Sequence, residues 1–176
     1  MTSSYRARGV PAGLVQFERR VAGLAFEAHS SNSESRLPML AQSLAMVRSA
    51  LPAMAQLTRA VVEAILLSEG SIGSAQEVAR HLGLPNRFKL ARMLREDGLP
   101  SLHRLAEWAT VESWVLAAER DDVSLCYLAF RSRRHPSACY RLVKRITGIC
   151  WDDVRARGSH WVQRQIQNLL KRAPRN

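Results

Sequence analysis

Residues 78–95 of the chain have the sequence VARHLGLPNRFKLARMLR, and this stretch decides the interpretation of the rest. The small side chain of Ala79 lets two helices approach closely, and Gly83 supplies the tight turn between them. After the turn, Leu90, Met93 and Leu94 recur at helical spacing and therefore share the inner face of a second helix. We predict a helix-turn-helix here. The polar and aromatic residues predicted on or beside its outer face are Arg87, Phe88, Lys89, Arg92 and Arg95.

The same layout recurs about 50 residues later along the chain. A first helix carrying Leu125, Leu128 and Ala129 is followed by the turn Arg133-Arg134-His135, and Pro136 opens a second helix. The apolar positions predicted for its inner face are Cys139, Leu142, Val143 and Ile146, and those predicted for its outer face are Ser137, Tyr140, Arg141, Lys144 and Arg145. Two such units in one chain make a chance pattern improbable.

Charge is concentrated on these two units. The 176 residues hold 26 Lys and Arg against 15 Asp and Glu, a formal net charge of +11. Residues 1–73 contribute seven basic and five acidic residues, and residues 74–176 contribute nineteen and ten. Acids are absent from 78–95 and from 123–151, and an acidic spacer lies between them. We expect two separate anion-contacting surfaces, with nucleic acid as the natural partner.

Several functional classes find no support in the sequence. No apolar run is long enough to span a bilayer, and no secretory signal is recognisable, so we expect a cytoplasmic protein without a membrane partner. Three cysteines without a CxxC spacing favour small core residues over a disulfide framework or a zinc site. None of His81, His103, His135 and His160 forms a recognisable i, i+4 ligand pair. A nucleophile elbow, a Walker loop and GxGxxG are also absent. We therefore expect no enzyme, metal or cofactor.

The fold class predicted from periodicity is all-α. Ser74 and Glu77 form a predicted capping box, Ser101 caps a long connecting helix, and Asp121-Asp122 are expected to start and charge the next helix. The four tryptophans are expected in the core. Helices are predicted over 14–28, 40–51, 53–67, 75–82, 85–97, 101–120, 123–132, 136–147 and 159–171, with a short turn over 152–156.

The segment from Ser74 to about Leu170 resembles the tandem helix-turn-helix DNA-binding domain of the AraC/XylS family of bacterial transcription regulators. The residues that carry the resemblance are Val78-Ala79 to Gly83-Leu84, Gly98-Leu99-Pro100, Pro136 to Arg141, Lys144 to Gly148, and Asp153-Val154-Arg155. The resemblance implies that each second helix enters a major groove and that a long helix joins the two halves.

The chain departs from the family pattern at three places. Its first turn is one residue longer than usual, and its second turn is one residue shorter. Arg133-Arg134 stands where the second unit of the family has Gly followed by Phe. Residues 1–50 are too short for the effector-binding domain of many members, so we expect a small N-terminal helical extension and no such small-molecule switch.

The sequence thus predicts a DNA-binding transcription regulator with two recognition helices, at about 86–96 and 136–147. The expected domains are 1–50, an N-terminal extension, and 51–176, with a first unit at 53–100, a connecting helix at 101–120 and a second unit at 121–172. Residues predicted to bind DNA are Arg80, Asn86, Arg87, Phe88, Lys89, Arg92, Arg95, Arg133, Arg134, His135, Ser137, Tyr140, Arg141, Lys144 and Arg145.

Within that set, the predicted readers of bases are Arg87, Lys89, Arg92, His135, Ser137 and Arg141, and the predicted phosphate contacts are Arg80, Arg95, Lys144 and Arg145. Phe88 is expected either against a thymine methyl group or folded beneath its helix. The expected partners are double-stranded DNA and RNA polymerase, with the chain a monomer or weak homodimer at the nucleoid. Two alternatives stay open, an RNA-binding helical module and an adaptor that acts through the N-terminal helices.

Overall fold

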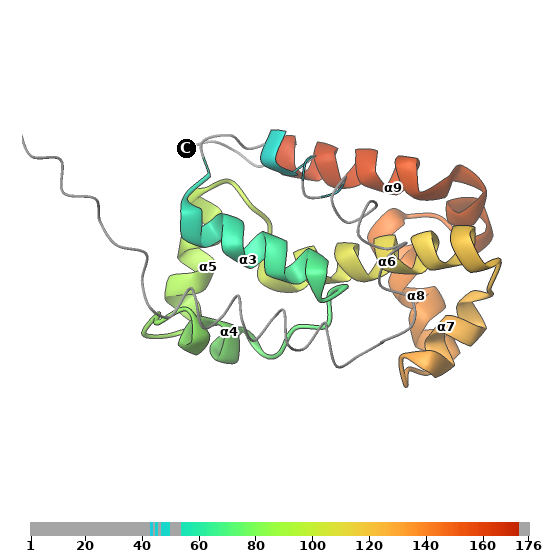
Figure 1. The fold of residues 1–176 in the computed structure, drawn as a ribbon, viewed down its shortest axis with the longest axis horizontal. Helices are drawn as coiled ribbons and strands as arrows, with labels where there is room; N and C mark the ends of the chain where they lie inside the picture. Colours follow the sequence, from blue (N-terminus) through green and yellow to red (C-terminus); the bar gives the residue numbers. More distant parts are fainter. Residues whose placement is uncertain (1–42, 44, 46, 50–53, 173–176) are drawn as a thin grey trace, which may run out of the picture.

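The computed structural model describes residues 43, 45, 47–49 and 54–172, and every regular element in this part of the chain is a helix (Figure 1). The all-α prediction is therefore confirmed for these residues. The predicted helix 14–28 and much of the predicted helix 40–51 lie outside them. The helices are α3 Gln56–Leu67, α4 Ala75–His81, α5 Arg87–Glu96, α6 Leu102–Asp121, α7 Leu125–Arg131, α8 Pro136–Thr147 and α9 Trp151–Arg172.

Several helix ends follow the predicted capping chemistry. The Ser74 side chain accepts a hydrogen bond from the Glu77 backbone N–H at 3.2 Å, and the Glu77 carboxylate accepts one from the Ser74 N–H at 2.6 Å. This is the predicted capping box of α4. Ser101 caps α6, Pro136 is the first residue of α8, and Gly148 ends α8 in the left-handed conformation. The ends of these helices are therefore encoded locally.

The prediction for Asp121 and Asp122 is wrong, and the prediction for the C-terminal residues is correct only in part. Asp121 is the last residue of α6 and Asp122 is its left-handed C-cap, whereas the N-cap of α7 is Ser124. The two carboxylates thus lie at a helix C-terminus, where they are held by Arg120 and Arg155 and not by a helix dipole. In α9, which runs from Trp151 to Arg172, Gly158 has the non-helical φ of +75° and ψ of +177°, so the predicted final helix over 159–171 agrees with the structure. The predicted short turn over 152–156 is wrong, because these residues are helical.

Helix α6 is the axis of the structure. It packs against α3, α7, α8 and α9 (Figure 1). Because these helices surround it, thirteen of its twenty residues are buried. A helix that is covered on every side needs apolar residues all round, and α6 lacks a polar face for this reason. Trp108 and Trp114 in α6 and Trp151 in α9 are buried as predicted, and Trp161 is half-buried.

The turn between α3 and α4 lies directly on α6. Gly70 has a φ of +75°, and a Cβ atom there would lie 2.1 Å from the backbone oxygen of Ala106. Only glycine permits this approach. The Thr110 hydroxyl donates a hydrogen bond to the backbone oxygen of Glu69 at 3.2 Å, which fixes the turn against the middle of α6.

Two acids of the predicted acidic spacer, Glu107 and Glu112, lie in the interior and not at the surface. Glu107 and Glu112 of α6 are 8% and 3% exposed, respectively. Glu112 accepts a hydrogen bond from the Ser43 hydroxyl at 2.5 Å, and the Gln163 side chain of α9 donates to the same hydroxyl at 3.3 Å. Burial raises the pKa of the Glu112 carboxyl, against the opposing effect of its hydrogen bonds with Ser43 and Gln163. The sequence pattern missed this because it does not reveal that α6 is covered on all faces.

Glu112→Gln tests the cost of burying this carboxylate. Because the folded pKa is raised, the native state holds its proton more tightly than the unfolded state, and stability is lost as pH rises through and above the ordinary value of 4.5. We expect the variant to gain stability relative to the wild type between pH 4 and pH 7, as measured by urea denaturation across that range.

The matched control is Glu96→Gln on the exposed side of α5. A hydrogen bond from Arg92 lowers the pKa of Glu96, so the pH dependence of this substitution has the opposite sign. A stability difference between Glu112→Gln and the wild type that does not change with pH contradicts the assignment.

Candidate nucleic-acid interface

Two pairs of helices, α4 with α5 and α7 with α8, are built in the same way and are joined by α6. Each first helix has seven residues and a serine N-cap, Ser74 in one and Ser124 in the other. Each has an alanine at the same position, Ala79 and Ala129, and both are fully buried at 0% exposure. These alanines let the second helix of each pair approach the first.

The turns of the two pairs share one backbone conformation. Gly83 has a φ of +69° and Arg133 a φ of +54°, each just after the C-cap of the first helix. The next residue donates its N–H back to the buried alanine, from Leu84 at 2.9 Å in the first turn and from Arg134 at 2.8 Å in the second. Arg133 therefore takes the place of a turn glycine at the cost of a left-handed conformation.

The second helix of each pair buries one face. Leu90 and Leu94 of α5 are both 1% exposed, and Met93 is partly buried beside them. The inner face of α8 is formed by Cys139, Leu142, Val143 and Ile146, all buried. These are the residues that helical spacing predicted for the two inner faces, so the orientation of both helices follows from the sequence.

All fifteen residues predicted to bind DNA have exposed side chains, and they divide between the two pairs. The Phe88 ring is 69% exposed, and the Arg87 guanidinium lies over it at 5.1 Å from the ring centre. Of the two expectations for Phe88, the one that folds it beneath the helix is wrong.

Some of these residues also cap the helices that carry them. The Asn86 side-chain oxygen accepts hydrogen bonds from the N–H groups of Phe88 and Lys89, both at 3.0 Å. The third N–H of that turn, from Arg87, is bonded to Gln76 of α4 at 3.2 Å. His135 caps α8 and its Nδ1 lies 2.8 Å from the Ser137 hydroxyl. The capping groups at both helix starts are therefore fixed in place.

Within the described part of the chain, ion pairs engage two of the predicted cations. Arg92 pairs with Glu96 one turn further along α5 at 2.7 Å, and both side chains are well exposed. Arg145 of α8 pairs with the buried Glu107 of α6. An exposed pair of the first kind contributes little to stability and releases its arginine readily, whereas the second ties α8 to α6.

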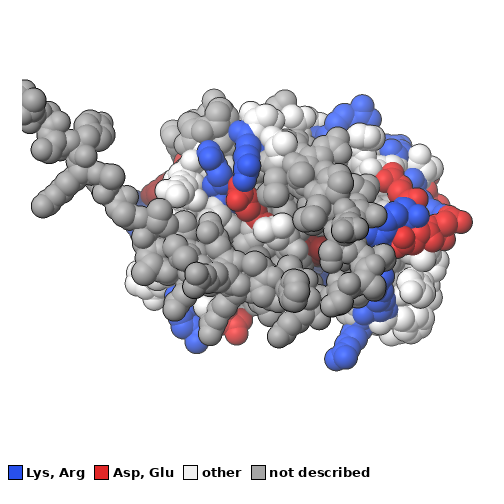
Figure 2. Space-filling model, in the orientation of Figure 1, with Lys and Arg blue, Asp and Glu red and all other residues white. Residues whose placement is uncertain are grey.

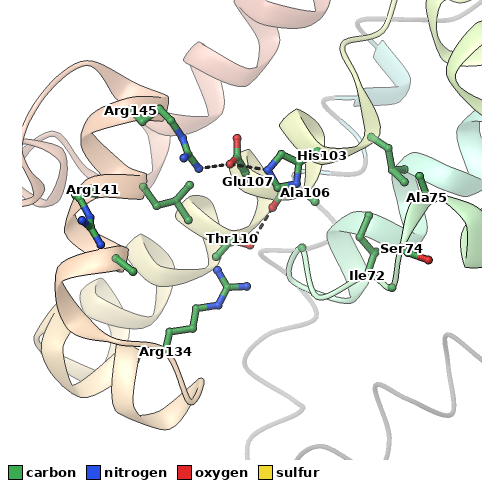
Figure 3. Close-up of a pocket in the computed structure, with 15 residues that line it drawn as sticks. Ile72, Ser74, Ala75, His103, Ala106, Glu107, Thr110, Arg134, Arg141 and Arg145 are labelled. Atoms are coloured by element: carbon green, nitrogen blue, oxygen red, sulfur yellow. Dashed lines mark hydrogen bonds and ion pairs between the residues drawn. The ribbon is translucent and has the colours of Figure 1, made fainter.

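A cleft of about 640 Å³ opens between the start of α4, the first half of α6 and α8 (Figure 3). It brings together Arg134, Arg141 and Arg145 of the predicted set, all from the second pair. The Arg134 guanidinium lies 5.8 Å from the centre of the Trp114 ring of α6. Arg134 thus contacts an aromatic ring of α6.

Sequence reasoning missed the contribution of α6 to this cleft. Glu107 accepts hydrogen bonds or ion pairs from Arg145 and from His103, the latter at 3.0 Å. His103 and Glu107 are an i, i+4 pair, so the statement that no histidine has such a carboxylate neighbour is wrong. The i, i+4 spacing of these two residues was the signal that the sequence offered. It indicates a site only together with the contact from Arg145, which the sequence does not show.

The chemistry of the remaining polar residues adds no second site in the described residues. No group of three or more His, Cys, Asp or Glu side chains there is arranged to hold a metal ion, and none of the helices described could cross a membrane. Cys139 is buried and Cys126 partly buried, as expected, but Cys150 is exposed and lies 3.0 Å from the Asp153 carboxylate.

The acidic side chains on the surface are concentrated away from the outer faces of α5 and α8. Figure 2 shows carboxylates gathered at the end of the molecule where α6 ends, with basic side chains interleaved among them. These acids include Asp121 and Asp122, which pair with Arg120 and Arg155. This patch is therefore internally neutralised, in contrast to the outer faces of α5 and α8.

Comparisons of the chain with protein-family models, with curated proteins and with solved structures find no match. The functional argument therefore rests on the two helix pairs and the cleft between them.

A reciprocal exchange tests whether the two turns are equivalent. Arg133→Gly should raise the free energy of unfolding by about 0.5–1 kcal/mol, because glycine occupies the left-handed region without steric cost. Gly83→Arg should lower it by about 1–2 kcal/mol. A Cβ at Gly83 meets nothing within 4 Å, so this loss reports the backbone alone. Denaturant unfolding measures both, and a destabilising Arg133→Gly would refute the equivalence.

Proposed function

We propose that the chain is a sequence-specific DNA-binding transcription regulator in which α5 and α8 enter successive major grooves of one duplex. The observation that carries the proposal is the duplicated construction, in which two helices of matching design each bury one face and expose cations on the other. An outer face of this kind is what a recognition helix presents to a groove. The AraC/XylS resemblance of the sequence supports the same assignment.

The length of α6 is compatible with this arrangement. Its 20 residues extend about 30 Å at 1.5 Å per residue. Successive major grooves on one face of B-DNA are about 34 Å apart. Because the helices at each end add their own width, one chain would reach both grooves without a partner subunit. An asymmetric site with two unlike halves follows, and dimerisation is not required.

Arg92 and Arg141 are the proposed base readers at equivalent positions. Each lies two residues after a fully buried residue of its inner face, Leu90 in α5 and Cys139 in α8. A guanidinium at such a position can donate two hydrogen bonds to the O6 and N7 atoms of guanine. The ion pair of Arg92 with Glu96 is no obstacle, because both side chains are largely exposed and exposed pairs of this kind are weak.

RNA binding is the second candidate, and exposed aromatic side chains favour it because they could stack on bases. Phe88, Tyr127, Phe130 and Tyr140 are all more than two-fifths exposed. They are distributed over α5, α7 and α8, however, whereas an RNA-stacking surface gathers its rings on one platform. DNA recognition by two helices therefore accounts for more of the surface.

Selection from a random pool of duplex DNA tests the proposal directly. We expect the wild-type chain to enrich a motif of two different half-sites whose centres lie about one helical turn, or 10–10.5 base pairs, apart. Enrichment of no motif, or of a single short half-site, would contradict reading by two helices.

Arg141→Ala and Arg92→Ala then assign the half-sites. Each variant should lose about 1–3 kcal/mol of binding free energy on the selected duplex, lose much less on scrambled DNA, and relax specificity in its own half-site only. Fluorescence anisotropy at one salt concentration measures both duplexes. Equal losses on selected and scrambled DNA would show that the arginine holds phosphate and does not read bases.

A further inference from the structure

The cleft between the helix pairs has walls of different chemistry. One wall belongs to α8 and the turn before it and carries Arg134, Arg141 and Arg145. The opposite wall is the turn over residues 70–74, which contains Gly70 and Gly73. The α6 residues that line the cleft are Leu102, His103, Ala106, Glu107 and Thr110, and Glu107 is the one acid among the described lining residues.

The charge of this acid is already matched. Glu107 is held by Arg145 and by His103, and its side chain is only 10% exposed. The remaining cations, Arg134 and Arg141, have no ion-pair partner among the described residues. Figure 3 shows the guanidinium groups of Arg134 and Arg145 both directed toward α6. The cleft therefore presents a net positive charge with donors held in place.

The position of the cleft suggests what occupies it. Arg141 belongs both to the outer face of α8 and to the cleft lining, so the cleft opens beside the proposed recognition surface. A duplex that offers major grooves to both α5 and α8 turns its intervening minor groove, flanked by phosphates, toward the middle of α6. The cleft is partly open to the surface, so a continuous backbone that passes along its mouth can reach the cations that line it.

We propose that this cleft binds the DNA phosphate backbone at the segment between the two half-sites, with Arg134 as its principal contact. The inference rests on the proposed function and adds a third point of attachment that carries no base specificity. Arg134 suits this role because its ring contact with Trp114 fixes the direction of the guanidinium, and planar guanidinium groups donate two hydrogen bonds to one phosphate. This contact would set the spacing between the half-sites.

The test uses the full chain and the selected duplex with neutral methylphosphonate links placed in the central segment. The wild type should bind the modified duplex about tenfold more weakly, the order expected for loss of a charged hydrogen bond. Arg134→Gln should bind the unmodified duplex more weakly and show no further loss on the modified one. Its dependence of log K on log salt should be shallower by about 1 on any sequence.

Two further variants control the experiment. Arg134→Lys keeps the positive charge, so its binding should be weakened by the methylphosphonate links nearly as much as that of the wild type. Arg164→Gln, on the exposed face of α9 away from the cleft, should behave as the wild type. Circular dichroism and thermal unfolding verify that each variant is folded.

The outcomes separate the two proposals. A wild type that enriches and binds a duplex but tolerates central methylphosphonates overturns the cleft assignment alone. The same holds when Arg134→Gln remains as sensitive to the modification as the wild type. A wild type that binds no duplex overturns the proposed function and the cleft assignment together.

Discussion

The burial of α6 on all sides is the constraint on which the rest of this structure depends. Thirteen of its twenty residues are buried, and α6 packs against α3, α7, α8 and α9. The turn that leads from α3 to α4 also lies on α6, where Gly70 approaches Ala106 and the Glu69 backbone oxygen accepts a hydrogen bond from Thr110. Two carboxylates of α6, Glu107 and Glu112, are buried, and each has polar partners from outside the helix. Glu107 pairs with Arg145, and Glu112 forms hydrogen bonds with Ser43 and Gln163.

The two helix pairs solve the same packing problem with different residues. A buried alanine, a left-handed residue after the first helix and a capped second helix occur in both, yet glycine makes one turn and Arg133 the other. The residue that follows Arg133 is Arg134, whose guanidinium lies 5.8 Å from the centre of the Trp114 ring at the edge of the cleft. The second turn therefore carries a left-handed arginine followed by a cation that contacts α6.

The sequence predicted what depends on local pattern. The capping box at Ser74, the proline start of α8 and the inner faces of α5 and α8 all follow from spacing and side-chain chemistry. It did not predict what depends on tertiary surroundings. Asp121 and Asp122 carry the signature of a helix start but end α6, and Glu107 and Glu112 of α6 lie in the interior. The cleft could not be predicted from the sequence either, because its walls come from three segments far apart in the chain.

The central claim is that the cations of α5 and α8 recognise base edges in duplex DNA rather than the charge of any nucleic acid. Equilibrium competition at one fixed salt concentration tests it most directly, with the selected duplex bound first and a structured RNA hairpin of equal length as competitor. The account predicts that about 10³-fold more RNA than unlabelled duplex is needed for half displacement, the lower end of specific over non-specific preference. Displacement by RNA and duplex at equal concentrations would contradict it.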